Sequence, residues 1–289
     1  MLNAFRMMRS VYRAQRAISR HDHESARVHL DVALAIQPNN GLANFLRGVA
    51  CYELLEHEDA YAHFSKSLAA NPNDANTFAL RALTAMRLDD IERARADLRH
   101  AAAIGERTIL TQLALATLRL QSGDYDAGLC HLRNVEALAP KAKEHKAATG
   151  IALFLKGDHL QARDSLRRAF AAGFTDAYAA LILHCAETRL GGNARSELEC
   201  AAAALSAGRW PRPVIEWLME RATAEDMLAD ASTDRERAEA HFYIGHCHLV
   251  AGRCDDATHH LKMAAASPLF MLTEREAARA ELARLGIAA

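Results

Sequence analysis

The chain has 289 residues, of which 51% are hydrophobic and 25% charged, a balance typical of a globular protein. The net charge is −1, which excludes a global field that would draw the chain to nucleic acid or to an anionic membrane. No apolar run approaches the ~18–20 residues that span a bilayer, and the N-terminus lacks the apolar core of a signal peptide. We therefore expect a cytoplasmic protein without a transmembrane segment or a nucleic-acid partner. A periplasmic or envelope-associated location stays open if a signal segment is missing.

Six cysteines lie far apart along the chain, and none forms a CxxC pair. A chain of this length folds without disulfides, and isolated cysteines in an Ala- and Leu-rich helical pattern behave as small apolar side chains. We expect buried free thiols and a reducing compartment.

The first predicted helix carries five arginines spaced by three, four, three and four residues, namely Arg6, Arg9, Arg13, Arg16 and Arg20. This spacing places them on one helical face, opposite Met7, Val11, Ala14 and Ile18. The basic stripe fits an amphipathic helix for an anionic membrane or an acidic partner. The simpler interpretation is the polar outer face that an end repeat needs for solubility.

A 34-residue repeat runs through most of the chain. It begins at residues 7, 41, 75, 109, 143 and 177, and once more at 238 after an interruption. Position eight is usually small: Ala14, Gly48, Ala82, Ala116, Gly150, His184 and Gly245. Position twenty is also small: Ala26, Ala60, Ala94, Gly128, Ala162, Ser196 and Ala257. Position twenty-four is usually large and apolar: Leu30, Phe64, Leu98, Leu132, Leu166, Cys200 and Leu261.

Each of these positions has a physical cause in a pair of antiparallel helices. Small residues at positions eight and twenty let the helices approach, and the large residue at twenty-four fills the groove between them. Position fifteen, glycine in four repeats, ends the first helix where a positive φ is needed. Proline at position thirty-two, in Pro38, Pro72 and Pro140, ends the second helix.

This pattern resembles the tetratricopeptide repeat (TPR). The resemblance implies an all-α fold, a right-handed TPR α-solenoid of about six to seven helix-turn-helix repeats with a C-terminal capping helix. It predicts a TPR array over residues 1–209, a Trp-Pro break and helical insert over 210–237, and a last repeat with the capping helix over 238–289. The sixth repeat is degenerate, and its frame stays open.

Side chains of the first helix of each repeat line the concave face of a TPR protein. The predicted partner-binding groove comprises Phe45, Leu46, Val49, Tyr52, Leu80, Leu83, Thr117, Ile151 and Phe154. Such an apolar groove suits an amphipathic helix or an extended peptide with large side chains, whereas the basic clamp used for C-terminal carboxylates is missing. Alternatively the chain fills the groove itself, because an open apolar surface of that size is a liability.

The last repeat is rich in histidine and cysteine, but without CxxC or HExxH spacing. His241 and His248 most simply replace aromatic rings of the repeat. We therefore predict no metal and no cofactor. Acidic pairs such as Asp89 and Asp90 lie at helix starts, so we also predict no catalytic residues and no enzyme.

The final predicted helix begins with a capping box formed by Thr273 and Glu276. Its apolar side (Ala278, Leu282 and Leu285) is expected to cover the last repeat while its charges face water.

The C-terminal quarter resembles bacterial TPR adaptors of the new-lipoprotein-I type in Trp210, Pro211, Glu239, Ala240, Phe242, Tyr243 and Gly245. That resemblance implies a non-enzymatic envelope scaffold that is often dimeric, although the lipidated cysteine of such proteins is missing. We predict a bacterial scaffold that binds a protein or peptide partner, with a homodimer possible. The alternatives are a self-associating assembly subunit and an accessory TPR domain of a larger enzyme system.

Overall fold

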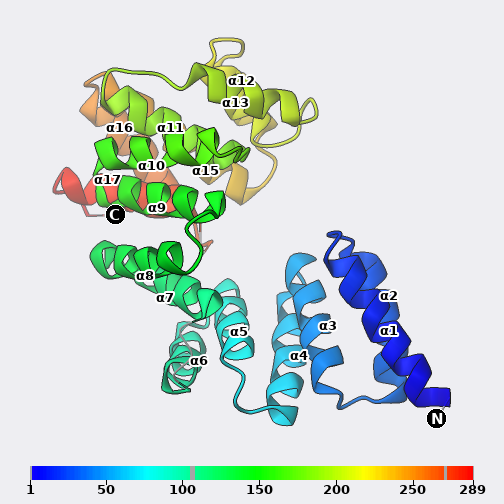
Figure 1. The fold of residues 1–289 in the computed structure, drawn as a ribbon. Coiled ribbons are helices and arrows are strands. Elements are labelled where there is room, and N and C mark those ends of the chain that lie inside the picture. The colour runs from blue at the N-terminus through cyan, green and yellow to red at the C-terminus, as the bar shows by residue number, and fades with distance from the viewer. Residues whose placement is uncertain (1, 105–107, 270–271, 289) are drawn as a thin grey trace. The chain divides into compact units, whose positions relative to one another are not determined.

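The computed structural model describes residues 2–104, 108–269 and 272–288, which form α-helices and no strand (Figure 1). The all-helical TPR architecture predicted from the sequence is confirmed. The chain divides into two compact units, Met1–Leu118 and Arg119–Ala289.

Unit 1 consists of consecutive helix pairs. They are α1 (Leu2–Ile18), α2 (His23–Ile36), α3 (Gly41–Glu53), α4 (His57–Ala70), α5 (Ala75–Arg87), α6 (Ile91–Ala103) and the greater part of α7 (Ile109–Gln121). Each of α1, α3 and α5 packs against the helix that follows it, and α2 and α4 also pack against the next pair. The contacts are therefore those of stacked hairpins.

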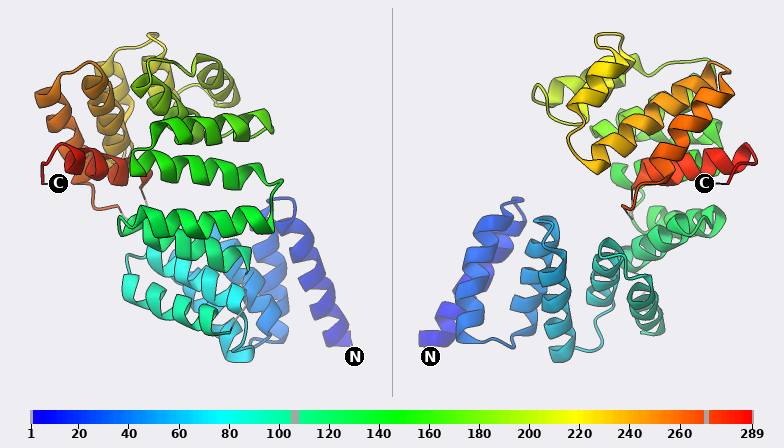
Figure 2. Two further views of the ribbon diagram at one scale, coloured as in Figure 1. Left: turned by 60° about the vertical axis from the view of Figure 1, so that its left-hand side comes forward. Right: turned by 180° about the vertical axis from the view of Figure 1, so that it is seen from behind.

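Unit 2 holds the remaining helices. They are α8 (Tyr125–Leu138), α9 (Lys143–Lys156), α10 (His159–Ala171), α11 (Ala177–Arg189), α12 (Arg195–Ala204), α13 (Arg212–Leu218), α14 (Ala224–Asp230), α15 (Asp234–Val250), α16 (Cys254–Ala265) and α17 (Thr273–Arg284). The helices α15 and α17 contact α11 and α9 respectively, so the end of the chain folds back onto earlier repeats of this unit (Figures 1 and 2).

The predicted repeat frame agrees with the helix boundaries. The helices α3, α5, α7, α9 and α11 begin at the predicted starts 41, 75, 109, 143 and 177. The helix α15 begins earlier, at Asp234, because Thr233 and Glu236 form a capping box before it.

The second helix of repeat six departs from the predicted frame. Ala194, Leu198 and Ala202 are buried there. Ala194 and Leu198 lie two residues before the predicted Ser196 and Cys200, which are exposed. The predicted contact of Cys200 at position twenty-four was therefore wrong. Leu198 is the large apolar residue that packs there.

Position eight meets position twenty-four in the hairpins that carry glycine. A Cβ on Gly48 would lie 2.7 Å from the fully buried ring of Phe64, and one on Gly150 would lie 2.6 Å from Leu166 Cγ. Alanine at position eight occurs with leucine at twenty-four, as in Ala82 and Leu98, both buried. The two positions therefore share one volume.

Position fifteen has a left-handed backbone in every repeat of the frame. The φ angle is positive at Gly123, Gly157, Gly191 and Gly252, and also at His21, Leu55 and Asp89, where it is 59°, 64° and 60°. A Cβ makes this conformation unfavourable, so the three hairpins with a non-glycine residue are strained at the turn.

Buried polar groups hold the last repeat to its neighbours. The Glu239 carboxylate is fully buried, and it accepts hydrogen bonds from Trp210 Nε1 at 2.6 Å and from Arg235 Nε at 2.7 Å. The Tyr243 hydroxyl donates to Glu274 of α17 at 2.8 Å. Burial, followed by the nearby charge of Glu239, raises the pKa of Glu274 to about 7.

Two expectations about α17 were wrong. Thr273 is the first helical residue rather than the cap, so its predicted capping box with Glu276 is not formed. Its charges do not all face water either, because Glu274, Glu276 and Glu281 are buried. Since α17 packs against α9, α15 and α16 together, more of its circumference is covered than a cap on one repeat requires. Arg189 compensates Glu281 at 2.8 Å.

The cysteines also differ from expectation. All six are free, but only Cys51 and Cys185 are buried, whereas Cys130, Cys200 and Cys254 are exposed. The exposed thiols lie on second helices, outside the positions that pack within a hairpin.

We expect Gly48→Ala to lower the free energy of unfolding by about 1–3 kcal/mol, because the new methyl group overlaps the Phe64 ring. Combined with Phe64→Leu, it recreates the Ala–Leu pair of the next repeat. Urea denaturation should then show the double variant to be at least about 1 kcal/mol more stable than the sum of the single changes predicts. Additive changes would contradict a shared volume at the two positions.

Relief of backbone strain makes Leu55→Gly a stabilising change of about 0.5–1 kcal/mol, even though glycine makes the unfolded chain more flexible. Leu55 is 75% exposed, so little packing is lost. The reverse change, Gly252→Leu, should destabilise by about 1 kcal/mol. Leu190→Gly is the control, because Leu190 is also exposed but has a φ of −103°. Thermal denaturation should show no gain there.

Removal of the buried carboxyl group of Glu274 should change the pH dependence of the free energy of unfolding. The pKa of folded Glu274 lies above its ordinary value of 4.5, so its contribution to stability is present below about pH 4.5 and is lost as the pH rises through about 7. Relative to the wild type, Glu274→Gln should therefore gain about 2–3 kcal/mol between pH 5 and pH 8. The variant must be compared with the wild type at each pH, because His246 also affects the pH dependence of stability. Burial lowers the pKa of His246, so its contribution to stability increases as the pH rises, opposite to that of Glu274. Glu225→Gln on the exposed side of α14 should show no such gain in parallel denaturation curves.

Candidate functional site

The predicted groove residues of unit 1 lie on α3, α5 and α7. Phe45, Val49, Tyr52 and Leu80 are half-buried and pack against one cluster that includes Phe64. The rings of Phe45 and Phe64 lie 6.1 Å apart. These four side chains therefore combine a fixed position with an accessible apolar edge.

The other three groove residues of unit 1 differ in exposure. Leu46 is only 7% exposed, because it belongs to the core shared by α1, α2 and α3. Leu83 and Thr117 are half-buried, and the Thr117 hydroxyl donates to the carbonyl of Leu113 at 2.9 Å. Leu46 thus supports the surface from below, whereas Leu83 contributes to it directly.

The groove residues of unit 2 are partly covered by the end of the chain. Phe154 is 1% exposed, and its ring lies 6.5 Å from Phe242 and 6.2 Å from His246 of α15. The Arg284 guanidinium of α17 donates to the carbonyl of Leu155. Ile151, one turn earlier on α9, is half-buried. The end of the chain therefore covers Phe154.

The five arginines of the basic stripe are all exposed, four of them on α1 and Arg20 just after it. The opposite side of the helix packs inward through Val11 and Ala14, which are 7% and 0% exposed, with Met7 and Ile18 beside them. The predicted division of α1 into a packed face and an arginine face therefore agrees with its burial.

A cavity of about 530 Å³ lies between α10 and α12, and the groove pattern did not predict it. Its walls are mainly apolar, with Phe170 and Phe174 on one side and Cys200, Ala201 and Ala204 on the other. The two rings lie 6.2 Å apart. The sequence held a signal for it, because Phe174 stands at position thirty-two, where three repeats have proline.

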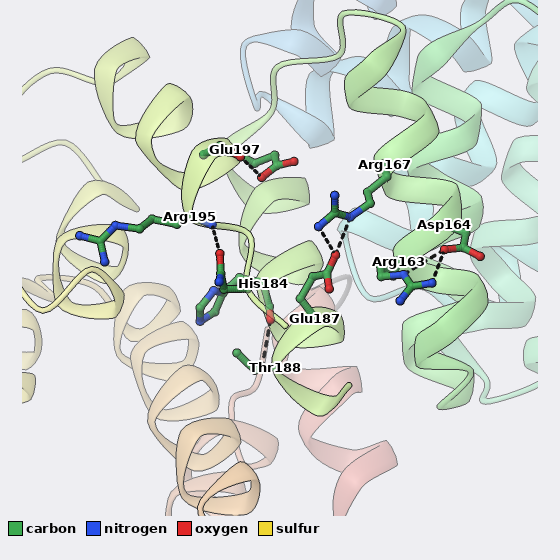
Figure 3. Close-up of polar contacts among 10 residues, drawn as sticks. Arg163, Asp164, Arg167, His184, Glu187, Thr188, Arg195 and Glu197 are labelled. Carbon is green, nitrogen blue, oxygen red and sulfur yellow. Dashed lines mark hydrogen bonds and ion pairs between the residues drawn. The ribbon is translucent and has the colours of Figure 1, made fainter. Parts of the chain in front are cut away.

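Charged side chains near this cavity are engaged with one another (Figure 3). Arg167 contacts the buried Glu187 carboxylate at 2.5 Å, and Ser196 Oγ donates to Glu197 at 2.7 Å. Arg163 pairs with its neighbour Asp164 at 2.8 Å. The apolar walls can receive an apolar side chain, and Glu197 lines the cavity together with Cys200.

The histidines of the last repeat form a stacked group between α15 and α16. His241 Nδ1 lies 2.9 Å from His260 Nδ1, and the rings of His248 and His260 stack at 5.5 Å. Burial, followed by the neighbouring histidines, lowers the pKa of His260 to about 4. Among the described residues, no group of three or more His, Cys, Asp or Glu side chains is placed to hold a metal ion. The rings of His241, His248 and His260 contact one another between the two helices.

Across the parts of the chain that the structure describes, we find no helix with the length and apolar character needed to cross a membrane.

No protein-family model matches the chain. Solved structures nevertheless share its fold. PilF of Pseudomonas aeruginosa has a TM-score of 0.56 and 15% identity, over 81% of this chain and 100% of PilF. PilW, a type IV pilus biogenesis factor, has a TM-score of 0.56 and 15% identity, over 77% of this chain and 96% of its own.

A third similar structure is TTC0263, a thermophilic TPR protein of Thermus thermophilus, with a TM-score of 0.55 and 15% identity. The match covers 62% of this chain and 98% of that protein. Identities this low establish the fold and leave the partner open. The helix pairs that begin every 34 residues, together with these structures, show that the chain has the fold of tetratricopeptide-repeat proteins.

Proposed function

We propose that the protein is a non-enzymatic adaptor that binds a segment of a partner protein on the apolar face of α3, α5 and α7. The observation that carries the proposal is the set of half-buried side chains at the predicted inward positions: Phe45, Val49, Tyr52, Leu80 and Leu83. They are anchored by the hairpin core and keep accessible apolar edges. Rigid, partly exposed apolar residues are the side chains that gain most when a partner covers them.

The expected ligand is an amphipathic helix or an extended segment with large apolar side chains. The predicted contacts Ile151 and Phe154 lie on α9 of unit 2, outside this face, and α15 covers the ring of Phe154. Shared fold with TPR proteins supports a role in protein interaction in general, and the choice of this face rests on its chemistry.

The remaining features of the function stay predictions. They include a bacterial origin, a cytoplasmic location, the absence of a cofactor, and a possible homodimer. The envelope role implied by the C-terminal resemblance also stays a prediction, as do the alternative assembly-subunit and accessory-domain roles.

Selection of peptides from a random library on the full-length protein tests the groove directly. We expect the selected peptides to carry bulky apolar residues at helical or alternating spacing. Their affinity, measured by fluorescence anisotropy, should fall at least tenfold for Val49→Glu with Leu83→Glu, because two carboxylates would be desolvated on binding.

The control variant is Val28→Glu with Leu55→Glu, which makes the same two changes at exposed sites outside the groove. Circular dichroism should show native helix content for both variants. Equal loss of affinity in both, or none in the groove variant, would mean that this face is not the binding site.

A further inference from the structure

The outward face of α1 carries positive charge that the protein itself does not neutralise. Arg6, Arg9, Arg13 and Arg16 on the helix, and Arg20 just after it, are exposed, and none forms an ion pair with a described residue. Residues 2–20 contain no Asp or Glu. The local charge is therefore strongly positive, although the whole chain has a net charge of only −1.

Large apolar side chains share this outward face. Phe5 is 68% exposed, and Met8 and Tyr12 are each 64% exposed. Their spacing of three and four residues aligns them in one row along the helix. Arg9 follows Phe5 by four residues and Arg16 follows Tyr12 by four, so the apolar row and the basic row lie side by side.

Solubility alone does not explain such a face. A polar end cap needs charges of mixed sign and few exposed apolar residues. The next helix has that ordinary character, because Arg27 of α2 pairs with Glu24 at 2.6 Å and with Glu56 at 2.8 Å. Among the described residues, the arginine face of α1 has no such pairs, and it adds a row of exposed large apolar side chains.

We propose that this face of α1 docks on the anionic surface of a lipid bilayer, with the helix lying in the plane of the interface. The arginines contact lipid phosphates, which guanidinium groups bind in a bidentate manner. Phe5 and Met8 enter the boundary between headgroups and acyl chains, and Tyr12 places its hydroxyl at headgroup level. The two adjacent rows match a bilayer, because that surface offers continuous negative charge and apolar volume along the same plane.

A membrane-docking face is separate from the proposed peptide groove. The groove residues lie on α3, α5 and α7, and the variants below leave them unchanged. Loss of one activity therefore does not imply loss of the other.

Flotation of the full-length protein with lipid vesicles tests the proposal. We expect binding to phosphatidylcholine vesicles that contain phosphatidylglycerol, weaker binding as salt screens the arginines, and none to phosphatidylcholine alone. Arg9→Gln with Arg13→Gln should weaken the partition coefficient by about tenfold or more. Phe5→Ser with Met8→Ser should weaken it at unchanged charge.

The charge-matched control is Arg95→Gln with Arg99→Gln on the exposed side of α6, which should bind like the wild type. Failure of the wild type to float with anionic vesicles overturns the proposal, and so does equal weakening by the α6 control. Binding to duplex DNA or polyglutamate without binding to vesicles would assign the face to another polyanion. A dimer in sedimentation that Phe5→Ser with Met8→Ser dissociates, without vesicle binding, would assign it to a second copy of the chain.

Discussion

The fold depends on one close contact, in which a small residue of the first helix of a hairpin meets a large apolar residue of the second. Where the small residue is glycine, the approach is so tight that a methyl group would overlap Phe64 or Leu166. This contact fixes the separation of the two helices, and the separation in turn fixes where the inward side chains stand. The apolar face on α3 and α5 is thus a consequence of core packing: Phe45 touches Phe64, and Phe64 touches Gly48.

Much of the hairpin packing could be predicted from the sequence, because the contact between a small and a large residue recurs every 34 residues. Repetition gave the helix starts of five repeats and the glycines at the turns. Repetition did not give the register of the second helix of repeat six, where Leu198 is buried in the core in place of Cys200. The sequence of this degenerate repeat left its frame open, and in the structure α12 packs against α11.

The fold-back of the C-terminal end could not be predicted from periodicity, since it depends on contacts outside the repeat. The residues of the lipoprotein-like motif take part in it: Trp210 and Glu239 bond to each other, and Tyr243 bonds to Glu274. In the sequence, the glutamates of α17 that become buried cannot be distinguished from the charged residues of an exposed helix face. For the same reason the burial of Phe154 beneath α15, next to the half-buried Ile151, could not be predicted from the repeat. The cavity beside Phe174 is a further case, because it arises where two repeats depart from their usual residues.

The fold-back also changes how unit 2 responds to perturbation. In unit 1 the contacts run between a helix and its near neighbours, as in a linear array whose hairpins open one after another. In unit 2 the contacts of α9 with α17 and of α11 with α15 join segments far apart in the sequence, so the end of the chain cannot open without exposing Phe154. Unit 2 should therefore lose its amide protection in a single cooperative step, whereas unit 1 should exchange its amide protons hairpin by hairpin.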